Sequence, residues 1–179
     1  MRIGELVRDV VIWVEHVAAL WNAVEKMEPL TSGQAKRFLD ESLVAHIGVI
    51  SAGVPYVTPM SFVVDSDRIL FRTKPGKRYE AMLENSAVSI EASTFDNETG
   101  DWTSVIVVGR AAEARDDATI SLTVQLLFQK YGTVLGSPLS RGEIQPMASF
   151  PHVMQVPIDE ITGMTSGGGF AMRTRPGRL

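Results

Sequence analysis

The chain has 179 residues, of which 45% are hydrophobic and 21% are charged, and this composition is typical of one globular domain with a sizeable core. The net charge of −4 at pH 7 argues against nucleic-acid binding, because nucleic-acid-binding domains are usually basic. The absence of cysteine excludes disulfides, thiolate catalysis and cysteine metal sites. The chain has no long uncharged apolar run, so we expect a soluble, cytoplasmic protein without a membrane partner.

The first predicted element is an amphipathic helix over residues 3–27. Its apolar residues recur near helical spacing, and charged residues fall mostly between them. Two explanations stay open: the helix covers the rest of the domain, which we favour, or it packs on a partner subunit. A helix lying on a membrane surface is disfavoured, because the polar face carries acidic residues instead of a stripe of Lys and Arg.

The remaining predicted elements are, in chain order, a helix over 31–41, strands over 43–50, 56–64 and 68–73, a helix over 77–83, strands over 87–93 and 102–114, a helix over 116–131, a loop over 132–149, and strands over 152–156 and 160–164. Residues 31–34, Thr-Ser-Gly-Gln, have the form of a capping box that starts the first of these helices. The second and third strands are predicted to form a hairpin around residues 65–67. Pro59 cannot donate to a strand ladder, so it predicts a bulge, an edge or a kink. The continuous apolar run of residues 105–108 predicts a strand that is buried on both faces.

Short strands, hairpin turns and few helices are typical of a mainly β domain, and they suggest a small closed antiparallel barrel with peripheral helices. We expect an N-terminal helical extension over residues 1–41, a barrel domain over residues 42–165 and a basic tail over residues 166–179. The tail begins in a run of glycines and ends in arginines, so we expect it to be flexible.

Thr73, Lys77 and Arg78 form the first candidate site. They stand where a predicted strand ends and a predicted helix begins. A helix N-terminus carries free N–H groups and a partial positive charge, and a phosphate group is bound by such donors together with cations and a hydroxyl. From these residues alone, a solvated basic turn is an equally good explanation.

The residues around this candidate site resemble a known family. Residues 57–64 read Val-Thr-Pro-Met-Ser-Phe-Val-Val, and after a tight turn come a strand that ends in Thr73 and the basic stretch Lys-Pro-Gly-Lys-Arg of residues 74–78. This order resembles the pyridoxamine 5'-phosphate oxidase-like family over residues 43–115 and 150–165. The resemblance implies that the barrel domain is an FMN-binding split β-barrel with six or seven antiparallel strands in a Greek-key-like order.

The resemblance also implies which residues hold the cofactor. Thr73 and Lys77 would bind the FMN phosphate, with Arg78 beside them. The flavin ring would lie, mostly through main-chain contacts, against Val57, Thr58, Pro59, Met60 and Ser61. The same stretch is equally consistent with a core strand in which Met60 and Phe62 point inward, and both descriptions can hold together.

A homodimer is a further implication of the resemblance, since in related split barrels the flavin lies at the interface and a strand of the partner approaches the ring. Trp102 and Ser104 match that strand by their order in the sequence. For Trp102, a place in an interface or core beside a turn is slightly favoured over contact with the flavin.

The three histidines, His16, His46 and His152, lack the spacing of metal ligands, and we predict no metal site. A lone histidine is more often structural than catalytic. His46 is worth testing because it lies on a predicted barrel strand, where an imidazole near a flavin could donate a proton to a substrate or ligate a haem.

These features predict an FMN-binding oxidoreductase or flavin reductase that acts on a small-molecule substrate. True pyridoxamine phosphate oxidases carry an Arg-rich C-terminal segment for the substrate phosphate. Arg173, Arg175 and Arg178 follow a glycine run and do not match that pattern, so the vitamin B6 reaction is not expected. The alternatives are a deazaflavin-dependent reductase on the same fold and a non-catalytic flavin- or haem-binding protein.

Overall fold

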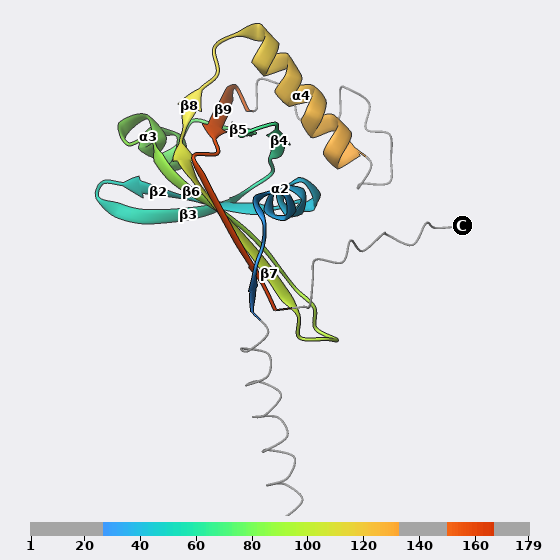
Figure 1. The fold of residues 1–179 in the computed structure, drawn as a ribbon. Coiled ribbons are helices and arrows are strands. Elements are labelled where there is room, and N and C mark those ends of the chain that lie inside the picture. Colours follow the sequence, from blue (N-terminus) through green and yellow to red (C-terminus); the bar gives the residue numbers. More distant parts are fainter. Residues whose placement is uncertain (1–26, 133–149, 167–179) are drawn as a thin grey trace, which may run out of the picture.

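The computed structural model describes residues 27–132 and 150–166 (Figure 1). The predicted helix over residues 3–27, the predicted loop over 132–149 and the predicted basic tail therefore lie outside the described residues, apart from their end residues. His16 lies outside them as well.

Two antiparallel sheets make up the described part of the chain, and three helices lie around them (Figure 1). The six-stranded sheet has the order β1 (Glu28–Pro29), β10 (Glu160–Thr165), β7 (Trp102–Arg110), β6 (Ala87–Phe95), β2 (Ala45–Ser51) and β3 (Val54–Met60). The four-stranded sheet has the order β4 (Val63–Asp65), β5 (Arg68–Thr73), β9 (His152–Pro157) and β8 (Ala112–Glu113). The helices are α2 (Ser32–Glu41), α3 (Lys77–Glu84) and α4 (Asp117–Gly132). The prediction of a mainly β, antiparallel split barrel with peripheral helices is confirmed, but the described strands form two sheets and not one closed barrel of six or seven strands.

The chain passes from one sheet to the other at two places that the sequence analysis predicted to lie inside single strands. The predicted strand 56–64 is broken after Met60, so that β3 pairs with β2 while β4 forms the hairpin with β5. The predicted strand 102–114 is broken at Ala111, and β8 joins the other sheet. Pro59 lies on β3, at the edge of the six-stranded sheet. A proline is tolerated in an edge strand because the N–H that it lacks would face away from the sheet and would not pair with another strand.

The prediction that residues 105–108 are buried on both faces is wrong for the described chain. Val105 and Val107 are fully buried, whereas Ile106 and Val108 are each 43% exposed. The reason is the period of two in a strand: alternate side chains of β7 face the core between the sheets, and the others face outward from the six-stranded sheet.

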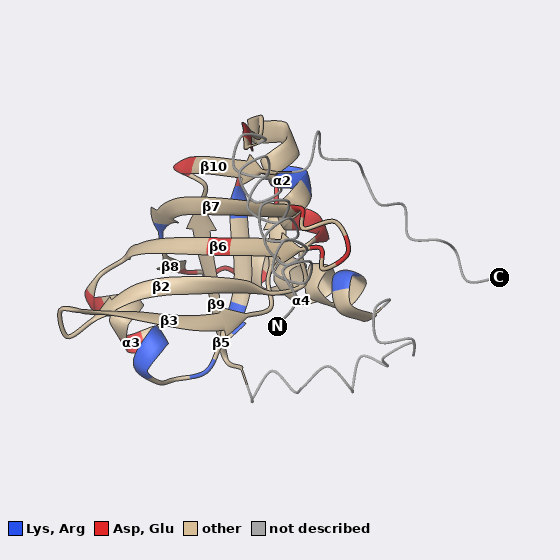
Figure 2. Ribbon diagram, turned by 90° about the horizontal axis from the view of Figure 1, so that it is seen from below, with Lys and Arg blue, Asp and Glu red and all other residues tan. Residues whose placement is uncertain are grey.

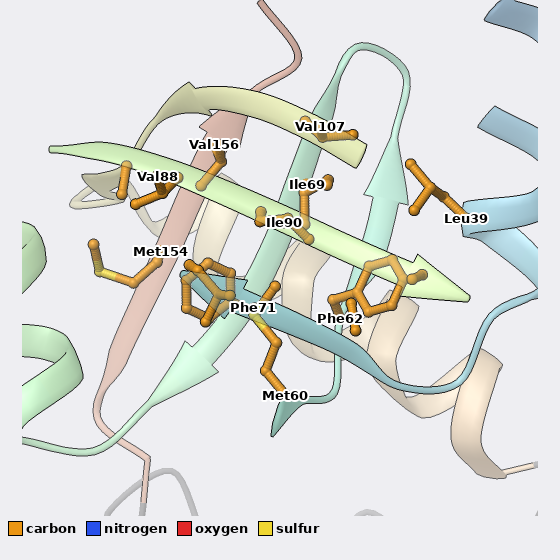
Figure 3. Packing of buried hydrophobic residues seen from close by; sticks show 14 of the residues in the cluster. Leu39, Met60, Phe62, Ile69, Phe71, Val88, Ile90, Val107, Met154 and Val156 are labelled. Atoms are coloured by element: carbon orange, nitrogen blue, oxygen red, sulfur yellow. The ribbon is translucent and has the colours of Figure 1, made fainter. Parts of the chain in front are cut away.

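The hydrophobic core lies between the two sheets, where Phe62, Phe71 and Met154 pack against side chains from β6, β7 and β9 (Figure 3). Helix α2 adds Phe38 and Leu39 to this core. The predicted capping box is confirmed: the Thr31 hydroxyl accepts from the Gln34 amide, and the Gln34 side chain accepts from the Thr31 amide. Among the described helices, none combines the length and the apolar run needed to cross a membrane.

Helix α4 holds the first of the two sheet crossings in place. The Tyr131 hydroxyl donates to the Leu43 carbonyl at 2.7 Å and accepts from the Phe62 amide at 2.9 Å. Burial raises the pKa of this hydroxyl above its ordinary value. The segment that follows β3 is therefore hydrogen-bonded to α4, a helix that lies far away in the sequence.

Gly109 marks the closest approach of the two sheets. A Cβ atom at this position would lie 2.2 Å from the Pro157 carbonyl oxygen and 2.8 Å from Val156 Cγ1. We expect Gly109→Ala to lower the free energy of unfolding by about 1–3 kcal/mol, because the backbone of β9 must move to accept the methyl group. Urea denaturation measures this difference. The control is Gly33→Ala in helix α2, where an added Cβ meets no described atom within 4 Å, so stability should be kept or increased. An equal loss in both variants would contradict the steric explanation.

Candidate functional site

The basic loop between β5 and α3 lies beside β3 (Figure 2). Helix α3 begins after Gly76, whose φ of 145° is a backbone conformation that side-chain-bearing residues rarely adopt. No side chain caps this N-terminus by a hydrogen bond. The N–H groups of the first turn, which have no acceptor within the helix, are therefore not satisfied by a cap and carry the positive end of the helix dipole.

Arg78, in the first turn of α3, joins three of the residues that the sequence analysis assigned to the cofactor. Its Nη1 donates to Thr58 Oγ1 and to the Pro59 carbonyl, and its Nη2 donates to Thr73 Oγ1, each at 3.1 Å. Burial lowers the pKa of the guanidinium, and the nearby Tyr56 partly offsets this. Arg78 is thus a preorganised cation at the point where β3, β5 and α3 meet.

The Nε atom of Arg78 is buried and has no hydrogen-bond partner among the described residues. A buried donor without an acceptor costs free energy, more so on a charged group. An anionic oxygen at this corner would supply the missing acceptor. The residues present therefore fit a phosphate group.

Thr73 and Lys77 flank Arg78 in different ways. Thr73 is buried, with 2% of its surface exposed, and its hydroxyl donates to the Lys74 carbonyl while it accepts from Arg78. In this arrangement Thr73 positions Arg78. Lys77 is exposed, and its Nζ lies 4.3 Å from the centre of the Tyr56 ring on β3. Its charge is therefore free to meet a ligand that approaches from solvent.

The predicted ring-binding stretch, residues 57–61, runs along edge strand β3 and one residue beyond it. Val57 and Pro59 are exposed on the outer face of the sheet, and Ser61 is exposed after the strand ends. Met60 and Phe62 are buried, so the expectation that they point inward is confirmed. An edge strand carries main-chain groups that no further strand pairs with, which suits contacts made mostly through the backbone.

Trp102 and Ser104 do not join this cluster within one chain. Both lie on β7, which is separated from β3 by β6 and β2, a distance of about 14 Å at the usual spacing of strands. Trp102 pairs with the exposed Phe95 across the β6–β7 hairpin. The Ser104 hydroxyl donates to Glu91 Oε1 at 3.4 Å.

Sequence reasoning missed the residues that hold α3 against the four-stranded sheet. The ring of Tyr79 on α3 stacks on the ring of His152 on β9, with 3.9 Å between ring centroids. Glu113 on β8 accepts from His152 Nδ1 at 2.6 Å and from the Tyr79 hydroxyl at 3.1 Å. The only signal in the sequence was the unassigned His152. This cluster fixes the helix that carries Lys77 and Arg78.

The hydrogen bond from His152 holds the pKa of Glu113 below its usual value of 4.5, and the Tyr79 hydroxyl adds to this effect. A carboxyl group with a lower pKa in the folded state stabilises the fold above pH 4.5, and this contribution is lost as the pH falls through the folded-state pKa. We expect Glu113→Gln to be less stable than the wild type by about 1–2 kcal/mol at neutral pH, the usual contribution of hydrogen bonds to a partly exposed charged group. The difference should shrink below pH 4.5.

Urea denaturation of wild type and Glu113→Gln at neutral pH and at a pH well below 4.5 measures the change. The control is Glu98→Gln, which alters an exposed carboxylate in the β6–β7 turn. A stability difference that does not change with pH would show that Glu113 acts through packing alone.

Comparison with known proteins gives one family. Residues 31–165 match the sequence profile of the family described as pyridoxamine 5'-phosphate oxidase. No curated protein matches the chain. The match covers every described strand except β1.

Solved structures show the same fold at low sequence identity. A FAD-binding protein from Mesorhizobium loti is 20% identical, with a TM-score of 0.62 over 78% of this chain and 96% of that chain. The FAD binding protein from Mycobacterium smegmatis is 23% identical, with a TM-score of 0.53 over 78% of this chain and 97% of that chain. The FAD and heme binding protein from Mycobacterium smegmatis is 15% identical, with a TM-score of 0.59 over 80% of this chain and 74% of that chain. The profile match over residues 31–165 and the two-sheet architecture show that the chain belongs to the pyridoxamine 5'-phosphate oxidase family, with its split-barrel fold.

Proposed function

We propose that the protein is an FMN-binding oxidoreductase or flavin reductase that works as a homodimer on a small-molecule substrate. The observation that carries the proposal is Arg78, a half-buried cation that is bonded to Thr58, Pro59 and Thr73 and has an unsatisfied, buried Nε donor beside an uncapped helix N-terminus. Such a corner matches the charge and the acceptors of a phosphate monoester.

The cofactor would lie along β3. Arg78, Lys77 and the first-turn amides of α3 would bind its phosphate, and the main chain of residues 57–61 would orient its ring at the sheet edge. A bound flavin supplies the hydride chemistry, while the protein supplies the anchor, the orientation and the exclusion of water. FMN ends in the phosphate monoester that this corner fits, which is why we propose FMN as the flavin.

A second copy of the chain would cover the outer face of the six-stranded sheet. This face exposes Val57, Ile106, Val108 and Met164, which lie on three strands of the sheet. Exposed apolar side chains that gather on one sheet face are a feature of protein interfaces. In this homodimer, Trp102 and Ser104 of the second copy would approach the flavin that the first copy binds.

The visible spectrum of the purified protein tests the proposal, followed by chromatography of the molecule released on denaturation. We expect a flavin spectrum and release of FMN. Release of FAD would contradict FMN as the cofactor, and it would require the corner at Arg78 to hold a diphosphate. A protein that stays colourless after incubation with FMN would contradict flavin binding.

A second candidate function is cofactor binding without turnover. Among the solved structures with this fold, one is described as a FAD-binding protein and another as a FAD and heme binding protein. These descriptions favour cofactor binding over an unrelated activity. A Soret band in the same spectrum identifies a haem protein. A flavin that is bound tightly but is not reduced by a nicotinamide dinucleotide identifies a carrier, and a deazaflavin-dependent reductase would be active only after that cofactor is added.

A further inference from the structure

The first turn of helix α3 is attached to strands of both sheets through two neighbouring residues, Arg78 and Tyr79. Arg78 donates hydrogen bonds to residues of β3, in the six-stranded sheet, and of β5, in the four-stranded sheet. The Tyr79 ring stacks on His152 of β9 with 3.9 Å between the ring centroids, and the Tyr79 hydroxyl donates to Glu113 of β8 at 3.1 Å. Four strands therefore fix the place where the helix begins.

The contacts of these two residues close into a ring. Thr73 on β5 and His152 on β9 are paired in register, so their side chains lie on the same face of the four-stranded sheet. Arg78 donates to Thr73, and Tyr79 stacks on His152. Because Arg78 and Tyr79 are adjacent in the chain, the helix cannot turn about its axis without breaking one of these two contacts. Glu113 strengthens the ring of contacts, since it accepts from both His152 and Tyr79.

This ring of contacts accounts for the buried Nε donor of Arg78, which has no hydrogen-bond partner among the described residues. The guanidinium carbon lies 5.8 Å from the centre of the buried Phe71 ring, which offers Nε no acceptor oxygen. A side chain that could swing into solvent would pair its Nε with water and avoid the cost of an unmade hydrogen bond. The contacts of the first turn therefore hold Arg78 in a geometry that a bound anion would complete.

We propose that Tyr79, His152 and Glu113 are positioning residues for the cofactor phosphate, which hold Arg78 and the first-turn amides of α3 in the binding geometry before the ligand arrives. This inference rests on the proposed function, because it takes the phosphate of FMN as the ligand. A preorganised site loses less conformational freedom on binding, so the three residues raise the affinity for the phosphate without contacting it. Their described hydrogen bonds and ring contacts do not include residues 57–61, so the affinity for the flavin ring should not depend on them.

The test compares the binding of FMN and of riboflavin to full-length apo protein, measured by quenching of flavin fluorescence. Tyr79→Ala should lower the affinity for FMN by about three- to tenfold, the net contribution of about one hydrogen bond, and should change the affinity for riboflavin by less than about twofold. Tyr79→Phe keeps the stacked ring and loses only the hydroxyl, so its affinity for FMN should lie closer to that of the wild type. His152→Ala should match Tyr79→Ala, and the double variant should lose no more than either single variant, because both changes break the same contact.

A second readout needs no ligand. In the wild-type apo protein, the buried Nε–H proton of Arg78 should exchange slowly with water in NMR spectra, and its absence from the spectrum of Arg78→Lys identifies the signal. In Tyr79→Ala this exchange should be at least about tenfold faster, because the side chain can then reach solvent. The matched control is Leu83→Ala, which shortens a side chain of the same helix that is 59% exposed and should change neither the exchange rate nor the affinity for FMN.

The outcomes separate this inference from the proposed function. A wild type that binds no FMN overturns both. If FMN binds but Tyr79→Ala and His152→Ala keep the wild-type affinity, only the positioning role is overturned. Equal weakening of FMN and riboflavin shows that the three residues support the fold as a whole, and exchange at Arg78 that is as fast in the wild type as in Tyr79→Ala shows that Arg78 is not held in place; each result overturns the inference. If Tyr79→Ala does not fold, His152→Ala decides the question with the same two ligands and the same NMR signal.

Discussion

Lys77→Ala lowers the affinity for FMN about ten- to a hundredfold and leaves the affinity for riboflavin nearly unchanged. The physical reason is the exposed ammonium of Lys77 at the start of α3, beside Arg78 and above Tyr56. A charge-assisted contact with a phosphate contributes about 1.5–3 kcal/mol, and riboflavin has no phosphate to lose. Quenching of flavin fluorescence during titration of the apo protein measures both affinities.

Two control variants make the result specific. Lys36→Ala removes a half-exposed cation of α2, which is paired with Asp67, and should change neither affinity. Arg78→Ala should weaken FMN binding as well, but it also removes three hydrogen bonds within the protein, so its thermal unfolding must be measured beside its binding. If Lys77→Ala weakens FMN and riboflavin equally, Lys77 supports the fold of the site and does not bind the phosphate.

Val108→Glu converts the proposed homodimer to a monomer at micromolar concentration. Val108 is 43% exposed on the outer face of the six-stranded sheet, next to Glu160 on β10. In a dimer that covers this face, the new carboxylate would be buried without a partner, at a cost of several kcal/mol, which raises the dissociation constant at least about 100-fold. Light scattering over a dilution series reports the change in mass.

The control for this variant is Leu83→Glu. Leu83 is 59% exposed on α3, away from the sheet face, so the same change in charge should leave the dimer intact. The variant also tests whether the site is shared, because loss of the dimer should weaken FMN binding if a second copy contributes Trp102 and Ser104. A wild type that is a stable monomer and still holds FMN tightly would contradict the shared site.

Much of the local structure could be predicted from the sequence because its causes are local. The Thr31–Gln34 capping box and the turn around residues 65–67 each depend on residues a few positions apart. The same holds for the first candidate site, since Thr73, Lys77 and Arg78 come from one strand end and the helix that follows. Their clustering could therefore be inferred before their contacts were known.

The crossings between the two sheets could not be predicted in this way. A strand that changes sheet keeps the β-type sequence pattern of a continuous strand, so residues 56–64 and 102–114 each looked like one element. Which sheet a segment joins depends on the partners it finds: β3 pairs with β2, whereas β4 pairs with β5. The burial of alternate residues in β7 was misjudged for the same reason, because an apolar run does not show whether a second layer covers its outer face.

The sequence by itself determined the family, the positions of most helices and strands, and a cationic corner with the composition of a phosphate site. Only the tertiary structure decided that Arg78 reaches back twenty residues to Thr58, that Tyr79, Glu113 and His152 fix helix α3, and that His46 stands beside Glu91. The physical reason is that strand pairing brings together side chains that are far apart in the chain. The register of each strand pair decides which side chains are neighbours, and this register depends on how both sheets pack on their common core.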